Sequence, residues 1–188
     1  MRNASLRLAA WRPHAAAVQA PPAMRAWLTT GGSLTAKLVA HSRAFRVQRL
    51  HQRLGLCLPD EARAVGLPRP GRVWEREVLL RCDGVPVVFA HTVVPLQASA
   101  DDWPLFSALG ERSLGTTLFH DPLVERGELE FARIRAGHPL MQRARAALGG
   151  MDGDQLYARR CLYRRKRGSL LVTEVFLPSV LALAPLMK

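Results

Sequence analysis

A carboxylate interrupts the apolar stretch LLVTEVFLP, which spans residues 170–178 and has the pattern of a β-strand. Because side chains alternate across a strand, Glu174 shares a face with Leu170, Val172 and Phe176. The opposite face is also mostly apolar, which is typical of a strand that is covered on both sides. A buried Glu174 therefore needs a cationic partner, a neutralising proton or a bound ligand.

A second charge, of opposite sign, falls in the segment VWEREVLLRCDGVPVVFAHTVVP, residues 73–95. The Asp-Gly pair at 83–84 is the strongest short signal for a two-residue hairpin turn. With these two residues as the turn, Arg76 lies opposite His91, and both fall on the apolar face that we expect to be buried. Glu75 and Glu77 fall on the other face, which we expect to be more solvated.

Arg76 and Glu174 together predict a site for a small molecule. The guanidinium fork matches a planar carboxylate, whereas a glutamate in apolar surroundings can bind a hydroxyl or move a proton. For a lone buried charge, a structural ion pair or an arginine whose head reaches water is the commoner explanation. Two charges of opposite sign on separate hairpins favour a pocket in which the ligand supplies the missing partner.

Other catalytic patterns are missing from the sequence. The histidines have no metal-ligand spacing, no serine lies in a nucleophile elbow, and no glycine-rich loop is arranged to cradle a phosphate. The three cysteines are widely spaced, and we interpret them as free thiols rather than a disulfide framework. We therefore expect a site without a metal or an organic cofactor.

The elements that must position these residues are mostly strands. Strands are expected over 123–137 and in a second hairpin that turns near Lys166–Gly168. Segment 44–59 fits either a strand start or a helix, and both interpretations stay open. Because the strands are linked by hairpins, we predict an α+β fold with a single antiparallel sheet and a few short helices packed on one side.

The helices are expected to be short. We predict a helix on each side of Gly31–Gly32, the second capped by Ser33 or Thr35. Segment 101–122 predicts a short helix followed by another short element, and segment 138–154 predicts a brief helix and a loop.

Charge is concentrated at the N-terminus of this 188-residue chain, whose formal net charge is +12. Residues 1–59 contain nine Arg and Lys and no Asp or Glu. We expect residues 1–23 to form a weakly ordered basic tail and residues 24–188 to form one domain; a transit peptide or a nucleic-acid arm are the alternatives for the tail. No apolar run approaches the ~20 residues of a membrane-spanning helix.

Three blocks, WEREVLLRCDGVPVVFAHTVVP, LGERSLGTTLF and LLVTEVFLP, resemble the chorismate pyruvate-lyase family in order and spacing. The resemblance covers roughly residues 24–180. It implies a sheet of about six antiparallel strands, with short helices and helical flaps over a buried ligand. It also implies cofactor-free removal of pyruvate from chorismate, which leaves 4-hydroxybenzoate, the aromatic precursor of ubiquinone.

The resemblance assigns roles to five residues. Arg76 would hold the ring carboxylate and Glu174 would meet the ring hydroxyl. Leu114 would contribute backbone groups from a flap, and Leu34, where the family can carry Met, would be an apolar lid contact. His91 stands where relatives often carry Arg. A histidine at this position weakens the positive field unless the imidazole is protonated.

The resemblance also suggests a cytoplasmic monomer that binds chorismate and 4-hydroxybenzoate, without nucleic acid or membrane insertion. A rival is a non-catalytic effector-binding domain, because some bacterial transcription regulators share this fold. Those regulators normally carry a preceding DNA-binding winged helix, and residues 1–23 are too short for one, which favours the enzyme. A third possibility is a related lyase that forms a different hydroxybenzoate.

Overall fold

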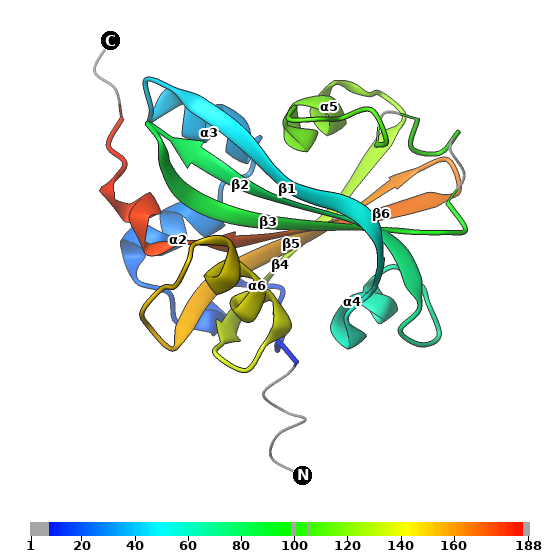
Figure 1. Cartoon of the computed structure of the whole chain (residues 1–188), viewed down its shortest axis with the longest axis horizontal. Helices are drawn as coiled ribbons and strands as arrows, with labels where there is room; N and C mark the ends of the chain where they lie inside the picture. Colours follow the sequence, from blue (N-terminus) through cyan, green and yellow to red (C-terminus); the bar gives the residue numbers. More distant parts are fainter. Residues whose placement is uncertain (1–7, 99–100, 105, 186–188) are drawn as a thin grey trace.

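The computed structural model describes residues 8–98, 101–104 and 106–185, and its strands form one open sheet (Figure 1). The six strands lie in the order β1-β2-β3-β6-β5-β4, and every neighbouring pair is antiparallel. They are β1 (Phe45–Leu56), β2 (Arg72–Cys82), β3 (Val85–Pro95), β4 (Val124–Arg135), β5 (Gln155–Arg165) and β6 (Gly168–Phe176). The predicted antiparallel sheet is confirmed.

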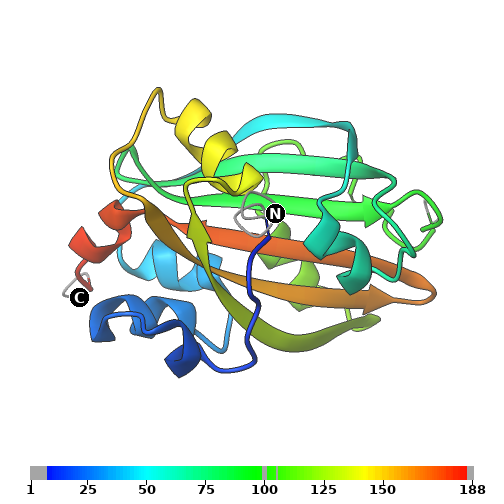
Figure 2. The same ribbon diagram turned by 90° about the horizontal axis from the view of Figure 1, so that it is seen from below.

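Short helices lie on both faces of the sheet, and not on one face as predicted (Figures 1 and 2). They are η1 (Ala15–Val18), α2 (Pro22–Leu28), α3 (Leu34–Ala40), α4 (Pro59–Ala64), α5 (Leu114–His120), α6 (Pro139–Ala147) and η2 (Pro178–Ala182). Helices α2, α3 and α5 pack against one face, and α4 and α6 pack against the other. Both faces of the central strands are apolar, so both need a cover.

The sheet therefore divides the core into two layers. In the layer that includes α6, Met141 is fully buried and clusters with Phe89 of β3 and Val175 of β6. In the other layer, Leu28 of α2 and Leu38 of α3 are fully buried and belong to one cluster with residues of β1, β2 and β3. Each layer can bury its own set of side chains, because successive residues of a strand point to opposite faces.

Several local predictions are confirmed. The Ser33 hydroxyl caps α3 by accepting a hydrogen bond from the Ala36 amide at 3.2 Å. Segment 44–59, which the sequence left open, contains the edge strand β1. The second hairpin turns at Lys166–Arg167, as predicted. Between β3 and α5, the described residues form turns, and the short helix expected before α5 is not among them.

The register of the β2–β3 hairpin differs from the prediction beyond the turn. Cys82 pairs with Val85 as expected, but the pairing shifts by one between Arg81 and Leu80, so that Leu80 opposes Val88. The extra residue lies next to Pro86, which has no amide N–H to donate to the ladder. A shift of one residue turns every later side chain to the other face. Arg76 therefore opposes Thr92 instead of His91.

The N-terminal segment is better ordered than a basic tail, as far as residues 8–23 are concerned. The indole of Trp11 donates a hydrogen bond to Asp60 Oδ2 at 2.8 Å. Arg12 pairs with Phe131 on the edge strand β4. Ala15 and Val18 are buried in the core. The expectation of a weakly ordered tail is wrong for this segment, since its apolar side chains pack on the sheet; residues 1–7 lie outside the described residues.

The described residues include no helix that is long and apolar enough to cross a membrane. The three cysteines, Cys57, Cys82 and Cys161, are buried free thiols, as predicted. They lie in different parts of the core, so they take no part in a shared metal or disulfide site.

Candidate active site

A cavity lies between the sheet and the roof formed by α3 and α5. Its unoccupied space, the open mouth included, is about 640 Å³. Strands supply the floor, through Arg76, Val78, Leu80, Ala90, Thr92, Arg126, Leu129, Arg159, Cys161, Tyr163, Val172 and Glu174. The roof includes Leu34 and Leu114, and the hydroxyls of Thr35 and Ser113 lie 2.6 Å apart where α3 meets α5. Such a concave, partly apolar space with a few polar groups is typical of a small-molecule site.

Arg76 carries positive charge into this cavity from β2, with only 3% of its surface exposed. Its Nη2 donates to the carbonyl oxygens of Gly110 (3.1 Å) and Arg112 (3.0 Å), in the loop before α5. Its Nε is buried and has no hydrogen-bond partner. Burial, and then the nearby charge of Arg49, lower the pKa of Arg76 to about 10, so it remains a cation at neutral pH.

Glu174 has a cationic partner within the protein. Its Oε2 accepts a hydrogen bond from Arg159 Nε at 2.5 Å, and the two residues face each other on β5 and β6. Arg159 Nη1 also donates to the carbonyl oxygens of Leu28 (3.1 Å) and Thr30 (2.9 Å). Arg159 thus fixes the carboxylate in the cavity wall and ties the α2–α3 connection to the sheet.

Arg126 is a third cation in the cavity wall, on the edge strand β4. Its Nη1 donates to the carbonyl oxygen of Gly31, and its guanidinium carbon lies 5.4 Å from the centre of the Phe119 ring. The buried thiol of Cys161 and phenol of Tyr163 line the same wall, and burial raises the pKa of each. Both are therefore neutral at pH 7, and arginines dominate the charge of the cavity.

The structure brings four of the five sequence-predicted site residues together. Arg76, Glu174, Leu34 and Leu114 all line the cavity. His91 does not, because the register shift in β3 turns it to the opposite face of the sheet. The expectation that His91 stands beside Arg76 is wrong, and His91 lies outside the cavity.

Sequence reasoning missed Arg126 and Arg159. A signal for Arg159 was present, because a two-residue turn at Lys166–Arg167 pairs residue 159 with Glu174 across the hairpin. Arg126 offered no comparable signal. It lies next to a register irregularity between Arg126 and Leu129 in β4, which breaks the strand alternation that would have placed it.

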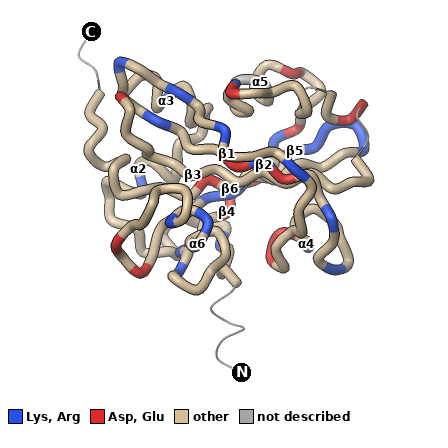
Figure 3. The backbone as a smooth tube through the Cα atoms, in the orientation of Figure 1, with Lys and Arg blue, Asp and Glu red and all other residues tan. Residues whose placement is uncertain are grey.

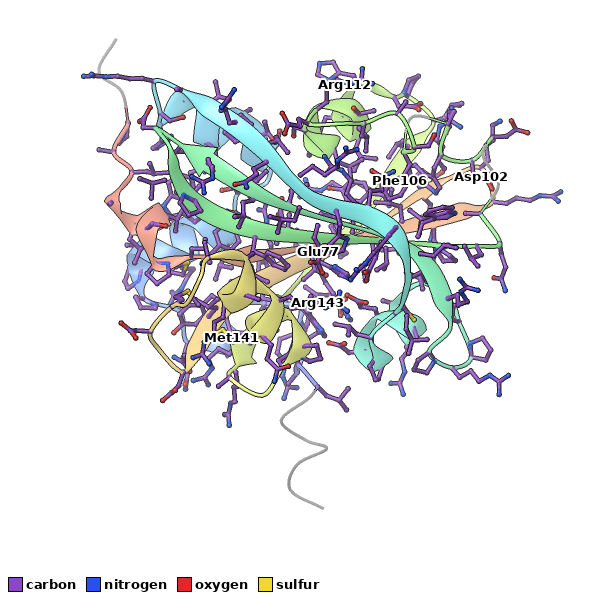
Figure 4. All side chains as sticks on the ribbon, in the orientation of Figure 1. Glu77, Asp102, Phe106, Arg112, Met141 and Arg143 are labelled. Carbon is purple, nitrogen blue, oxygen red and sulfur yellow. The ribbon has the colours of Figure 1, made fainter. Side chains whose placement is uncertain are left out.

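Behind the cavity, on the other face of the sheet, lies a far-face cluster made of His51, Glu61, Glu75, Glu77, His91 and Arg143. Figure 3 shows acidic positions in the middle of the sheet, and Figure 4 shows Glu77 and Arg143 side by side on the α6 side. Glu77 accepts hydrogen bonds from His51 Nε2 (2.9 Å), His91 Nδ1 (3.1 Å) and Arg143 Nη1 (2.7 Å). The expectation that Glu75 and Glu77 are solvated is wrong, since each is at most 4% exposed.

Three members of the far-face cluster, Glu75, Glu77 and His91, have potential ligand atoms within 4.8 Å of one another. Arg143 already neutralises this group, because its Nη1 lies 3.1 Å from Glu75 and 2.7 Å from Glu77. A metal ion would have to displace that guanidinium. We interpret the cluster as an ion-pair network that anchors β2 to α6 and α4, directly behind Arg76.

The far-face cluster shifts two pKa values in opposite directions. Burial alone would lower the pKa of His91, but the charges and hydrogen bonds of Glu61 and Glu77 outweigh it and raise the value to about 9. Burial alone would raise the pKa of Glu77, but His91 and Arg143 outweigh it and lower the value to about 2. His91 is therefore a buried imidazolium at neutral pH.

We expect the free energy of unfolding to fall between pH 6.5 and pH 9. His91 has a folded pKa above its ordinary value of 6.5, so its contribution is complete below pH 6.5 and is lost as pH rises through about 9. The loss is on the order of 3 kcal/mol. Urea unfolding at several pH values checks this, with His91→Gln as the comparison. An equally steep decline in the variant would show that another group is responsible.

Comparisons with known proteins agree with these features. A family model described as "Chorismate lyase" matches residues 5–183. The "Probable chorismate pyruvate-lyase" of Cupriavidus metallidurans is 48% identical over 178 residues, which cover 94% of this chain and 83% of that protein. The protein of the same name from Ralstonia nicotianae is 49% identical over 162 residues, with 85% and 83% covered.

Solved structures with a similar fold are more distant in sequence. The C-terminal domain of PhnF superimposes with a TM-score of 0.54 at 19% identity, over 74% of this chain and 86% of that domain. PhnF from Mycobacterium smegmatis gives a TM-score of 0.55 at 16% identity, over 85% and 70% of the two chains. At such low identity, the likeness establishes the fold alone.

Proposed function

The chain belongs to the chorismate lyase family and is a lyase, and we propose that it eliminates pyruvate from chorismate to leave 4-hydroxybenzoate for ubiquinone biosynthesis. The observation that carries this proposal is the meeting of Arg76 and Glu174 in one cavity beneath α3 and α5. These two residues supply a carboxylate-binding cation and a hydroxyl-binding anion in one partly apolar cavity.

The proposed reaction requires little covalent chemistry from the protein. The ether bond between the ring and the enolpyruvyl group breaks, the ring carbon that bears the hydroxyl loses a proton, and the enolpyruvyl methylene gains one. The products are an aromatic ring and pyruvate, so aromaticity drives the reaction. The protein must hold the reactive conformer and stabilise charge on the departing enolpyruvate.

Each proposed role follows from a contact. Arg76 binds the ring carboxylate, because its buried Nε lacks a partner while its Nη2 is held by the loop before α5. Glu174 accepts a hydrogen bond from the ring hydroxyl, and Arg159 holds that carboxylate in its orientation. Leu34 and Leu114 cover the ring from α3 and α5. We expect the roof to move as ligands enter and leave, and product release to limit turnover.

The proposal is tested by mixing the purified protein with chorismate after dialysis against a chelator. We expect 4-hydroxybenzoate and pyruvate in equal amounts, with no added metal or cofactor. A different hydroxybenzoate would identify a related lyase. Binding of chorismate without any product would identify a non-catalytic ligand-binding domain. Gel filtration of the same preparation, followed at 260 and 280 nm, tests the further expectation of a monomer that binds no nucleic acid.

A further inference from the structure

We propose that Arg126 binds the second carboxylate of the substrate, the one on the enolpyruvyl group, and so distinguishes the substrate from the aromatic product. This inference rests on the proposed function, because it assigns a partner to the part of chorismate that Arg76 and Glu174 do not reach. Nothing in the sequence patterns singled out this residue, and the structure alone places it in the cavity wall.

The charge of the cavity favours a dianion. Among the described lining residues, three guanidinium groups, those of Arg76, Arg126 and Arg159, face one carboxylate, that of Glu174. Arg159 and Glu174 neutralise each other at 2.5 Å. The remaining net charge is +2, from Arg76 and Arg126. Chorismate carries two carboxylates, and 4-hydroxybenzoate carries one.

Unused hydrogen-bond donors point to the same two arginines. Of the described side chains that line the cavity, only Arg76 and Arg126 have a buried polar atom without a hydrogen-bond partner, and in both the atom is Nε. A buried donor without a partner is costly, and a carboxylate oxygen is the acceptor that a guanidinium matches best. Arg76 and Arg126 therefore each have a buried Nε donor that a carboxylate oxygen can satisfy.

The two arginines lie on the same face of the sheet and approach the cavity from strands on opposite sides of it. Arg76 belongs to β2 and Arg126 to β4, four strands away in the order β2-β3-β6-β5-β4. Their backbones are separated by about 19 Å along the sheet at ~4.8 Å per strand. Thr92 of β3, Val172 of β6 and Cys161 of β5 form the floor between them. A ligand with an anionic group at each end can thus contact both.

The guanidinium of Arg126 is held in position before any ligand binds. Its Nη1 donates to the carbonyl oxygen of Gly31, and its face packs against Phe119 of α5. These contacts limit the rotamer freedom that a long side chain would otherwise lose on binding. Such preorganisation suits a group that must stabilise the negative charge that develops on the departing enolpyruvate.

The test compares ligands with one and two carboxylates in Arg126→Met and wild-type protein. We expect the chorismate KM to rise roughly 10- to 100-fold, as for a lost charge-assisted hydrogen bond, while the Kd of 4-hydroxybenzoate changes less than about threefold. The Kd of 3-carboxymethoxy-4-hydroxybenzoate, an unreactive aromatic dicarboxylate, should rise with the chorismate KM. Arg135→Met, an exposed position on the same strand, is the matched control and should leave all three values unchanged.

Two outcomes would overturn the assignment. Unchanged affinities for both dicarboxylates would show that Arg126 does not bind the second carboxylate. An equal loss for all three ligands would show that Arg126 only holds Gly31 and α5 in place. If Arg126→Met does not fold, Arg126→Lys must show the same split between ligands, at roughly three- to tenfold. If the wild-type protein binds the unreactive dicarboxylate through Arg126 but forms no product from chorismate, the proposed function fails while this inference stands.

Discussion

Arg76→Met is expected to lower kcat/KM for chorismate by roughly 10²–10³-fold and to weaken 4-hydroxybenzoate binding by a comparable factor. Both ligands carry the ring carboxylate, so both lose the same ion pair. The effect is large because Arg76 is buried, and a charged partner in such a site interacts more strongly than in water. Steady-state kinetics and direct binding of 4-hydroxybenzoate measure the two effects separately.

The control for Arg76 is its neighbour Arg49, an exposed residue of β1 whose charge acts on Arg76 from outside the cavity. Arg49→Met should leave turnover close to the wild-type value. Arg76→Lys keeps the charge but loses the planar fork, so its activity should lie between those of the wild type and Arg76→Met. If Arg76→Met released pyruvate at the wild-type rate, Arg76 would not be the carboxylate-binding residue.

Glu77→Gln is expected to lower the free energy of unfolding by roughly 3–5 kcal/mol, the usual cost of leaving buried charges without their partner. Glu77 is 4% exposed and accepts hydrogen bonds from His91 and Arg143, both cations in the folded protein. The amide keeps the shape of the side chain but removes its negative charge. Urea unfolding at pH 7 gives the difference directly.

The matched control for Glu77 is Glu128→Gln on the edge strand β4, where the side chain is exposed. We expect that variant to stay within about 0.5 kcal/mol of the wild type. A Glu77→Gln protein as stable as the Glu128→Gln protein would mean that the far-face cluster does not anchor β2. The effect of Glu77→Gln on chorismate turnover should follow its effect on stability, since Glu77 does not line the cavity.

Much of the fold could be predicted because local signals and global pairing agree. The Asp83-Gly84 turn and the turn at Lys166–Arg167 each join two strands in the structure. Glu174 stood out because a carboxylate in an apolar strand must find a partner, and the structure supplies both Arg159 and a cavity. These inferences needed only neighbouring residues and the two-residue period of a strand.

The remaining features of the fold and of the site depend on tertiary contacts that local sequence patterns do not encode. One extra residue beside Pro86 reverses the faces of β3, and with them the place of His91. That reversal turns an expected ligand contact into a member of an ion-pair network with Glu61 and Glu77. Likewise, residues 8–23 look like a tail until β4 provides an edge on which Arg12 can pair. Bulges and long-range docking are tertiary events, so local patterns could not foresee them.

The division of β2 between two compartments bears on how such a scaffold can diversify. Residues 76, 78 and 80 meet the cavity, whereas residues 75, 77 and 79 meet the helices behind it. Point changes at the even-numbered positions can therefore alter ligand preference while the odd-numbered positions preserve the framework. Inserting or deleting one residue within the strand would exchange the two sets and ruin both compartments together. New specificities on this scaffold should arise by substitution in the strands, with length variation confined to the loops.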